Sequence, residues 1–232
     1  MHKFVLCFSL FIIYSFIGWC IEVVAVSYTK KKFVNRGFLI GPYCPIYGVS
    51  ALIMVFLLNK YKEDISVLFW MSFIVCSIIE YLTSYIMEKL FKARWWDYSD
   101  RLFNVNGRIC LKNGICFGAL GVLLIRYINN FLMYDLNLLS YNILYSLNII
   151  LFICFSVDLF ISFNVICKIK KTTVVIKKDY TEEITEKVKN IVSKSSFLSR
   201  RLFNAFPTLT IFGTFIKPFK FRRKKKNLFR HK

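Results

Sequence analysis

The stretch FVLCFSLFIIYSFIGWCIEVVAVS, residues 4–27, decides the fold class, because it is long, almost wholly apolar and carries one acidic residue. A helix that crosses a bilayer needs roughly 20 mostly apolar residues. No small-residue cleavage site follows, so a retained helix is predicted rather than a signal peptide. Four further apolar runs occupy about residues 43–60, 65–90, 109–128 and 144–167. The sequence therefore predicts an all-α integral membrane protein with about five transmembrane helices in residues 1–168.

Composition agrees with this class and excludes several others. Hydrophobic residues make up 56% of the 232 positions, with 25 phenylalanines, and mean hydropathy is +0.51. The two histidines, His2 and His231, stand at the chain ends, which argues against a histidine-dependent catalytic site. A phosphate-binding Gly-x-x-x-x-Gly-Lys loop is absent, and the eight cysteines form no C-x-x-C pair. We therefore expect no metal, no cofactor and no enzyme activity.

The net charge of +20 is concentrated at one end. From Lys168 onward the chain has 19 basic and 4 acidic residues, so residues 169–232 are predicted to form a basic, partly helical tail. Residues 177–194 have the spacing of a short amphipathic helix, and residues 197–216, interrupted by Pro207, are expected to lie at the membrane surface. Residues 219–232 should bind anionic lipid at about 1 kcal/mol per basic residue. Nucleic acid is disfavoured as a partner, because the chain is already membrane-bound.

Orientation follows from the basic residues between the apolar runs. The first and third connections are rich in lysine and arginine, whereas the second and fourth are poor in them. Basic connections stay in the cytoplasm. We therefore predict a multi-pass protein of the bacterial cell membrane, with the N-terminus outside and the basic tail inside.

Three acidic residues interrupt the first, third and fifth apolar runs: Glu22, Glu80 and Asp158. At about 1.5 Å per residue, all three lie about 12–15 Å from the inner boundary. A charge that faces lipid costs at least about 2.5 kcal/mol, so these carboxyls are expected to converge inside the bundle. Ser84 and Glu88 follow Glu80 at intervals of four residues, so they lie on the same face of the predicted helix. The cluster could conduct or bind a substrate, or it could only lock the helices together.

Residues 35–48, NRGFLIGPYCPIYG, hold three glycines and two prolines, which indicates irregular backbone. Such backbone is tolerated at membrane depth only where protein buries it or where it lines a cavity. The segment is therefore either re-entrant or an interfacial loop, and its Asn35 and Arg36 join the polar-cluster candidates. Arg36, Arg94 and Arg108 are the candidate basic partners of the acids.

Two further sets of residues have expected roles. The fourth apolar run has a face of small residues that is expected to pack against another helix: Gly114, Gly118 and Gly121. The third connection is expected to form an inner-face surface that contacts a partner, and its candidates are Arg94, Trp95, Trp96, Asp97, Asn104, Asn106 and Arg108.

Several motifs together identify a family. They are Gly-Trp-x-x-Glu (18–22), Asn-Arg-Gly-Phe-Leu-x-Gly-Pro-x-x-Pro-Ile-Tyr-Gly (35–48), Glu-Tyr-x-x-Ser-Tyr-x-Met-Glu-Lys-x-Phe (80–91), Arg-Trp-Trp-Asp-Tyr-Ser (94–99), Phe-Asn-x-Asn-Gly-Arg-Ile-Cys-Leu (103–111) and RRLFNAFP (200–207). They closely resemble the bacterial ABC-transporter permease family, type IV (CmpB-like). The resemblance implies the membrane subunit of a transporter driven by an ATPase on a separate chain, with a homo-oligomer as a further expectation.

Two alternatives stay open from the residues themselves. The inner-face loops could instead form a scaffold or regulator that docks partners without transport. An intramembrane enzyme could use Glu22, Glu80 and Asp97 as acid–base groups, but the absence of a core histidine and an evident nucleophile places this reading last.

Overall fold

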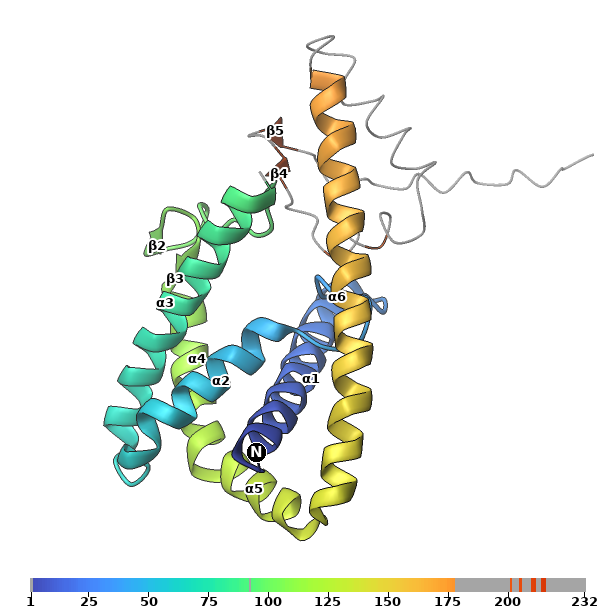
Figure 1. Ribbon diagram of the computed structural model, residues 1–232. Helices are drawn as coiled ribbons and strands as arrows, with labels where there is room; N and C mark the ends of the chain where they lie inside the picture. The colour runs from blue at the N-terminus through green and yellow to red at the C-terminus, as the bar shows by residue number, and fades with distance from the viewer. Residues whose placement is uncertain are drawn as a thin grey trace, which may run out of the picture.

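The computed structural model describes residues 2–91 and 93–177 and, in the C-terminal segment, residues 201, 205, 210–211 and 214–215. The described chain is a bundle of long helices with only two-residue strands (Figure 1). The prediction of an all-α membrane protein is therefore confirmed. The amphipathic segment expected at 177–194, apart from its first residue, the lipid-binding tract at 219–232 and most of 197–216 lie outside the described residues.

Within described residues 2–177 the α-helices are α1 (His2–Lys30), α2 (Pro45–Leu58), α3 (Ile65–Phe91), α4 (Leu111–Leu123), α5 (Asn129–Leu138) and α6 (Tyr141–Lys177). A 3₁₀ turn, η1 (Asn59–Tyr61), extends α2, and a π-helical turn, η2 (Leu124–Ile128), joins α4 to α5. The apolar run expected to end near residue 128 therefore continues, through η2, to Leu138.

Four stretches of helix in the described chain are long and apolar enough to cross a membrane: Lys3–Lys30, Ile65–Phe91, Leu111–Leu138 and Tyr141–Cys167. The second predicted crossing differs from these. Its 14-residue helix α2 spans only about 21 Å, and with η1 it reaches Tyr61. Pro45 fixes its start, because a proline suits the first helical turn but cannot donate a hydrogen bond further along a helix.

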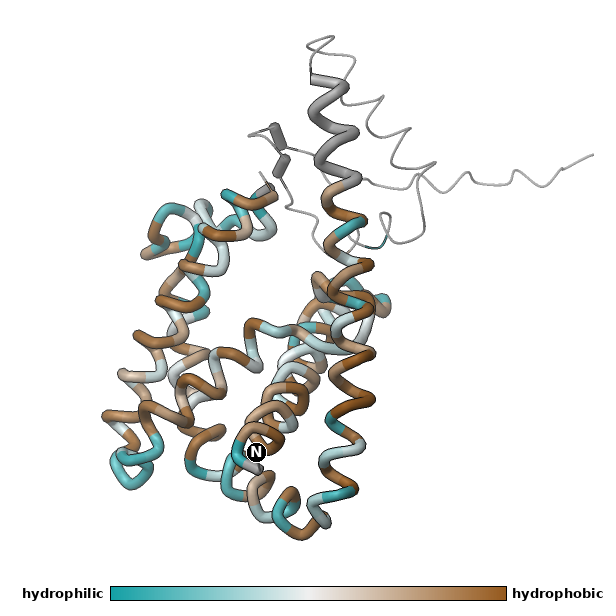
Figure 2. Tube along the Cα trace, viewed as in Figure 1, coloured by the Kyte–Doolittle hydropathy of each residue, from teal (hydrophilic) through white to brown (hydrophobic). Residues whose placement is uncertain are grey.

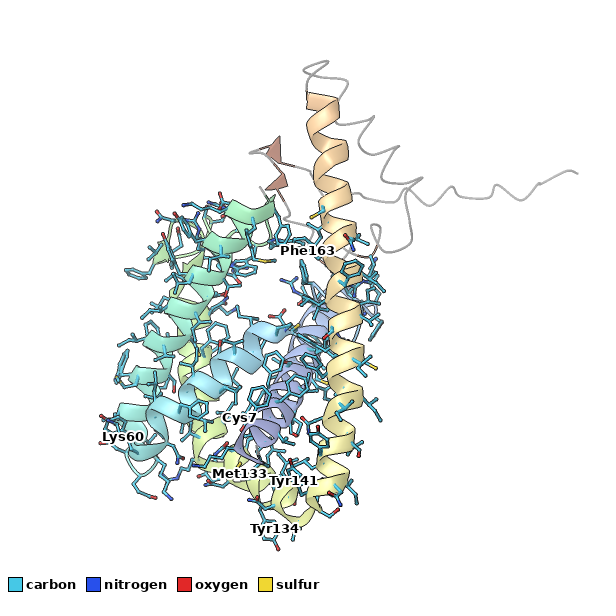
Figure 3. All side chains as sticks on the ribbon, viewed as in Figure 1. Cys7, Lys60, Met133, Tyr134, Tyr141 and Phe163 are labelled. Atoms are coloured by element: carbon cyan, nitrogen blue, oxygen red, sulfur yellow. The ribbon has the colours of Figure 1, made fainter. Side chains whose placement is uncertain are left out.

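The helices alternate in direction between two ends of the bundle (Figure 1). One end carries the C-terminus of α1, residues 31–44, the C-terminus of α3 and the start of α4. The opposite end carries the N-terminus, residues 62–64 and α5, and Lys60 lies there too (Figure 3). Hydrophilic residues gather at these two ends, and apolar residues dominate the helices between them (Figure 2).

Short strands among the described residues form two small sheets at the first end. A hairpin of β2 (Asn104–Val105) and β3 (Ile109–Cys110) follows α3. The strand β1 (Ala93–Arg94) pairs antiparallel with β4 (Thr210–Ile211), which in turn pairs with β5 (Thr214–Phe215). The β1–β4 ladder ties the C-terminal segment to the connection between α3 and α4.

Two buried apolar clusters hold the helices together. One joins α1, α2, α5 and α6, and the other joins α2, α3 and η2 around Leu68 and Ile125, both fully buried. Buried polar side chains bridge helices beside them. The Tyr14 hydroxyl donates to Asn129 Oδ1 at 2.8 Å, and Asn148 Nδ2 donates to Ser9 Oγ at 2.8 Å. Such bonds satisfy groups that lipid could not.

Helices α3 and α4 pack closely because the α4 face toward α3 is made of glycines. A side chain at Gly114 would meet Phe73, one at Gly118 would meet Phe69, and one at Gly121 would overlap the Cβ of Ser72. Small residues at such a contact let two helix backbones approach.

Replacing Gly121 with valine is expected to lower the free energy of unfolding by about 1–3 kcal/mol, because the new side chain overpacks the contact with Ser72. Thermal unfolding in detergent measures this loss. Ala119→Val adds bulk to the exposed face of the same helix and is the matched control. Equal melting temperatures for the two variants would contradict this account of the α3–α4 contact.

Candidate functional site

The connection between α1 and α2, residues 31–44, is the centre of the candidate site, and we call it loop segment 31–44. The helix α1 ends where Lys31 takes a positive φ of 49°, a common way to terminate a helix. The segment then runs without helix or strand to Pro45. Leu39, in its middle, is fully buried, so this backbone lies inside the protein.

Asp158 of α6 binds the backbone of this segment. The N–H of Ile40 donates to Asp158 Oδ1 at 2.9 Å, and the N–H of Gly41 donates to Oδ2 at 2.7 Å. Ser162 Oγ donates to Oδ1 at 2.9 Å, and Tyr43 also hydrogen bonds to this carboxyl. Asp158 is 8% exposed, so one buried carboxylate supplies the acceptors that two non-helical N–H groups need.

Arg201 of the C-terminal segment binds the carbonyl side of the same backbone. Its guanidinium donates to the carbonyl oxygens of Phe38 at 3.2 Å and of Gly37 and Ile40 at 3.4 Å. Burial lowers the pKa of Arg201, and the nearby Asp158 carboxylate opposes that shift. Loop segment 31–44 is thus held between an anion on its N–H side and a cation on its carbonyl side.

Glu22 of α1 pairs with a basic residue of the loop. Arg36 Nε lies 2.8 Å from Glu22 Oε2, and the Tyr47 hydroxyl donates to Glu22 Oε1 at 2.7 Å. Arg36 also donates to the carbonyl of the fully buried Ala205 at 3.3 Å. The expectation that Arg36 folds back onto an intramembrane acid agrees with this geometry.

Asn35 connects α1 to the inside of the same segment. Trp19 Nε1 donates to Asn35 Oδ1 at 2.8 Å, and Asn35 Nδ2 donates to the Ile40 carbonyl at 3.3 Å. The side chain of Asn35 therefore helps to satisfy loop backbone as well as the indole of α1.

Glu80 of α3 has different partners. It is 7% exposed, the Tyr98 hydroxyl donates to its Oε1 at 3.4 Å, and it also hydrogen bonds to the side chain of Asn113. Burial and the carboxylates of Glu80 and Glu22 raise the pKa of Tyr98, so its hydroxyl stays a hydrogen-bond donor. Ser84, one turn along α3, is also buried.

The three acids do not meet as one group. Glu22 and Glu80 both act on Tyr98, whereas Asp158 contacts the loop backbone, α6 and Tyr43. Loop segment 31–44 connects these two sets of contacts, because its Arg36 binds Glu22 and its Ile40 and Gly41 bind Asp158. We call the first set the polar cluster: Glu22, Arg36, Tyr47, Glu80, Tyr98 and Asn113.

The expectation that Arg94 and Arg108 partner the intramembrane acids needs correction. Both arginines bind Glu88, near the end of α3, at 3.3 and 2.8 Å from Oε2. Arg94 also approaches Asp97 Oδ1 at 3.7 Å, and Arg108 stacks over the rings of Tyr81 and Tyr85. Glu88 lies nearer the end of α3 than Glu80 does, so the two arginines pair with Glu88 and not with Glu80.

The rest of the third connection binds mainly to itself. Trp96 donates to the Arg108 carbonyl at 2.9 Å, Asp97 accepts from Ser99, and Asn104 closes the turn through the carbonyls of Ser99 and Arg101. The hairpin turn uses positive φ at Asn106 and Gly107, and the Asn106 side chain donates to Tyr81 at 3.0 Å. Among the described residues of the connection, 99–103, Val105 and Asn106 stay exposed.

Trp95 is buried instead of facing a partner. It packs against Phe38 of the loop and Phe91 of α3, and Phe91 packs against Phe163 of α6. The aromatic group joins three elements beside the polar cluster, so we assign Trp95 a packing role.

Several residues of this site were not among the candidates from the sequence, including Tyr47, Tyr98, Asn113 and Arg201. Tyrosines are common at membrane ends, so their type alone does not distinguish them. Tyr47, Tyr98 and Arg201 each stand in one of the family motifs, at 35–48, 94–99 and 200–207, and these motifs are the signal that could have indicated specific contacts.

The chemistry available is that of acids, amides, phenols and arginines. In the described chain no three histidine, cysteine, aspartate or glutamate side chains gather in a group that could hold a metal ion. The site instead offers hydrogen bonds and charges buried among apolar helices.

The fold and this site define a helical membrane protein with a polar cluster at membrane depth. A family model described as "putative ABC-transporter type IV" matches residues 9–163, and the chain belongs to this family. The matched range extends from α1 into α6 and includes loop segment 31–44, which confirms the resemblance found in the sequence. Neither the curated proteins nor the solved structures give a match.

Asp158→Asn is expected to lower the free energy of unfolding by about 1.5–3 kcal/mol, the range for a hydrogen bond to a charged group. The asparagine side chain has one oxygen and one NH₂ group, so its NH₂ would face a loop N–H group and that hydrogen bond would be lost. Thermal unfolding and trypsin cleavage at Arg36 measure the effect, and cleavage should become faster. Asp135→Asn, on the exposed face of α5, removes the same charge as a control. Identical behaviour of both variants would contradict the role given to Asp158.

Proposed function

We propose that this chain is the permease, the membrane component of a transport system, and that its ATPase is a separate chain. Membership of an ABC-transporter family and the apolar helices make it a transport-related membrane protein. The observation that supports the finer proposal is the incomplete second crossing, in which the short helix α2 is preceded by buried non-helical backbone.

Broken crossings of this kind are where transporters bind their ligands. Unwound backbone and helix ends at membrane depth offer polar groups that an intact helix uses up in its own hydrogen bonds. Here the break faces Glu22 and Asp158, and each contact is an ion pair or hydrogen bond that a ligand could exchange. The substrate path would then run between helices α1 and α6.

The partner ATPase would dock on the end that carries the third connection. Residues 99–103 form its exposed tip, and Leu102 and Phe103 are 84% and 79% exposed. Phe103 holds a positive φ of 50°, which is uncommon for a bulky residue. Two apolar side chains presented this way suit insertion into a groove of a partner.

The test is to recover the tagged protein from its native membrane in mild detergent. We expect an ATPase subunit to copurify and its ATP hydrolysis to rise when the full chain is present. Leu102→Asp with Phe103→Asp should abolish recovery of the ATPase, while Leu139→Asp, at the opposite end, should not. Repeated recovery of the intact chain without an ATPase would favour the alternative, a scaffold or regulator that docks other partners.

The proposed sidedness places loop segment 31–44 and the third connection in the cytoplasm. The alternation of basic and non-basic connections supports it, together with the arrangement of both segments at one end of the bundle (Figure 1). The basic tail would then meet anionic lipid of the inner leaflet, and a homo-oligomer remains part of the proposal.

A membrane-impermeant thiol reagent tests this orientation. A cysteine at Lys62 should react from outside intact cells, and a cysteine at Arg101 should react only after the cells are opened. The parent chain gives the background from its own cysteines. The reverse pattern would overturn the proposed orientation.

A further inference from the structure

The three intramembrane acids differ in what neutralises them. Glu22 has the Arg36 guanidinium at 2.8 Å, and Asp158 has two backbone N–H groups, with Arg201 close enough to interact electrostatically. The partners of Glu80 are neutral, a phenol and an amide. Among the described residues no basic side chain forms an ion pair with Glu80.

The position of Glu80 makes an uncompensated charge costly. It lies near the middle of the span Ile65–Phe91 and is 93% buried. A carboxylate removed from water and left without a cation is strongly disfavoured, and in proteins such a group takes up a proton instead.

The surroundings of Glu80 add to this cost. Glu22, on α1, is close enough to act on Glu80 electrostatically, and two neighbouring carboxylates resist being ionised together. Arg36 is already engaged by Glu22 and by the Ala205 carbonyl. The titratable, charged and polar groups around Glu80 on each element are Glu22 of α1, Arg36 of the loop, Cys76 and Ser84 of α3, Tyr98 of the third connection and Asn113 of α4.

We propose that Glu80 is a reversible proton-binding site, so that the ligand of this part of the polar cluster is H⁺. Tyr98 and Asn113 hydrogen bond to the carboxyl and fix its position, and neither supplies a positive charge that would pair with its ionised form. When the proton leaves, the remaining carboxylate attracts Arg36, which would have to release Glu22. Proton occupancy of Glu80 would thereby change the ion pair that fixes loop segment 31–44 to α1. Use of this exchange in transport rests on the proposed function, but proton binding itself does not.

A hydrophobic carbodiimide tests the site directly, because it reacts with protonated carboxyls in apolar surroundings. The carboxyl oxygen bonds to the carbodiimide carbon, the proton moves to a nitrogen, and rearrangement leaves a stable N-acylurea with no leaving group. Dicyclohexylcarbodiimide is added to the full-length chain in lipid vesicles without an ATPase, and peptide mass spectrometry locates the adduct.

We expect the adduct on Glu80 and its loss in Glu80→Gln, with the yield falling as pH is raised. Glu88→Gln should keep the label, since the Glu88 carboxylate is paired with Arg94 and Arg108 and lies outside the polar cluster. Absence of label from Glu80, or suppression by sodium ions at constant pH, would overturn the proposal. Because no ATPase takes part, failure here is distinct from failure of the permease proposal.

Stability of glutamine variants gives a second, independent readout. Glutamine mimics a protonated carboxyl, so Glu80→Gln should leave the melting temperature of the full chain unchanged. Glu22→Gln removes the partner of Arg36 and should lower it. A Glu80→Gln chain that melts well below the parent, or fails to fold, would show that the native state needs the charged carboxylate and would also overturn the proposal.

Discussion

The structure depends on how the backbone of loop segment 31–44 is satisfied away from water. A helix satisfies its own N–H and carbonyl groups, but non-helical backbone among apolar helices has to find partners from other elements. Asp158 takes two N–H groups, Asn35 and Arg201 take carbonyls, and the N–H of Cys44 donates to the Ser15 carbonyl of α1 at 2.9 Å. Apart from Asn35, which lies in the segment itself, these partners belong to α6, α1 and the C-terminal segment, so the hydrogen bonds of this backbone need those three parts of the chain together.

This requirement gives the buried acids separate roles. Asp158 contacts the segment itself, and its loss would leave backbone N–H groups without acceptors. Glu22 contacts it through an ion pair with Arg36, and because the two side chains are 30% and 23% exposed, the pair is weak evidence of stability. In the described part of the chain, Glu80 hydrogen bonds to Tyr98 and Asn113 and forms no hydrogen bond or ion pair with the segment. A role in holding the loop segment accounts fully for the buried position of Asp158, partly for that of Glu22 and least for that of Glu80. Glu80 is therefore the acid to which we assign an exchangeable ligand.

Much of this arrangement could be predicted from the sequence. Apolar length gave the helices, and the spacing of Glu22, Glu80 and Asp158 from the next lysines placed them at similar depth. The glycines and prolines of residues 35–48 indicated irregular backbone, and Gly114, Gly118 and Gly121 indicated a close helix contact. These features are local, and each follows from the bilayer as solvent or from backbone sterics.

The pairing of charged groups could not be predicted in the same way, because it depends on how far each loop folds back. Arg36 forms an ion pair with Glu22. Arg94 and Arg108 were also expected to pair with intramembrane acids, but they form ion pairs with Glu88. We expected the three acids to meet because the sequence predicts the same depth in the membrane for each. Depth in the membrane does not determine which side of its helix a residue is on, or which helices are neighbours in the bundle. Loop segment 31–44 separates Asp158 from the contacts of Glu22.

The contact of Arg201 with loop segment 31–44 has a consequence for how the chain can move. An anion on α6 and a cation near residue 200 bind opposite sides of the same few peptide groups, and Arg36 in the loop binds the Ala205 carbonyl in return. The ladder of β1 with β4 fixes the same C-terminal segment to the connection after α3. A displacement of the C-terminal segment would therefore remove hydrogen bonds from the loop backbone and from β1 at once. Arg201 thereby connects the C-terminal segment to the broken crossing between α1 and α2.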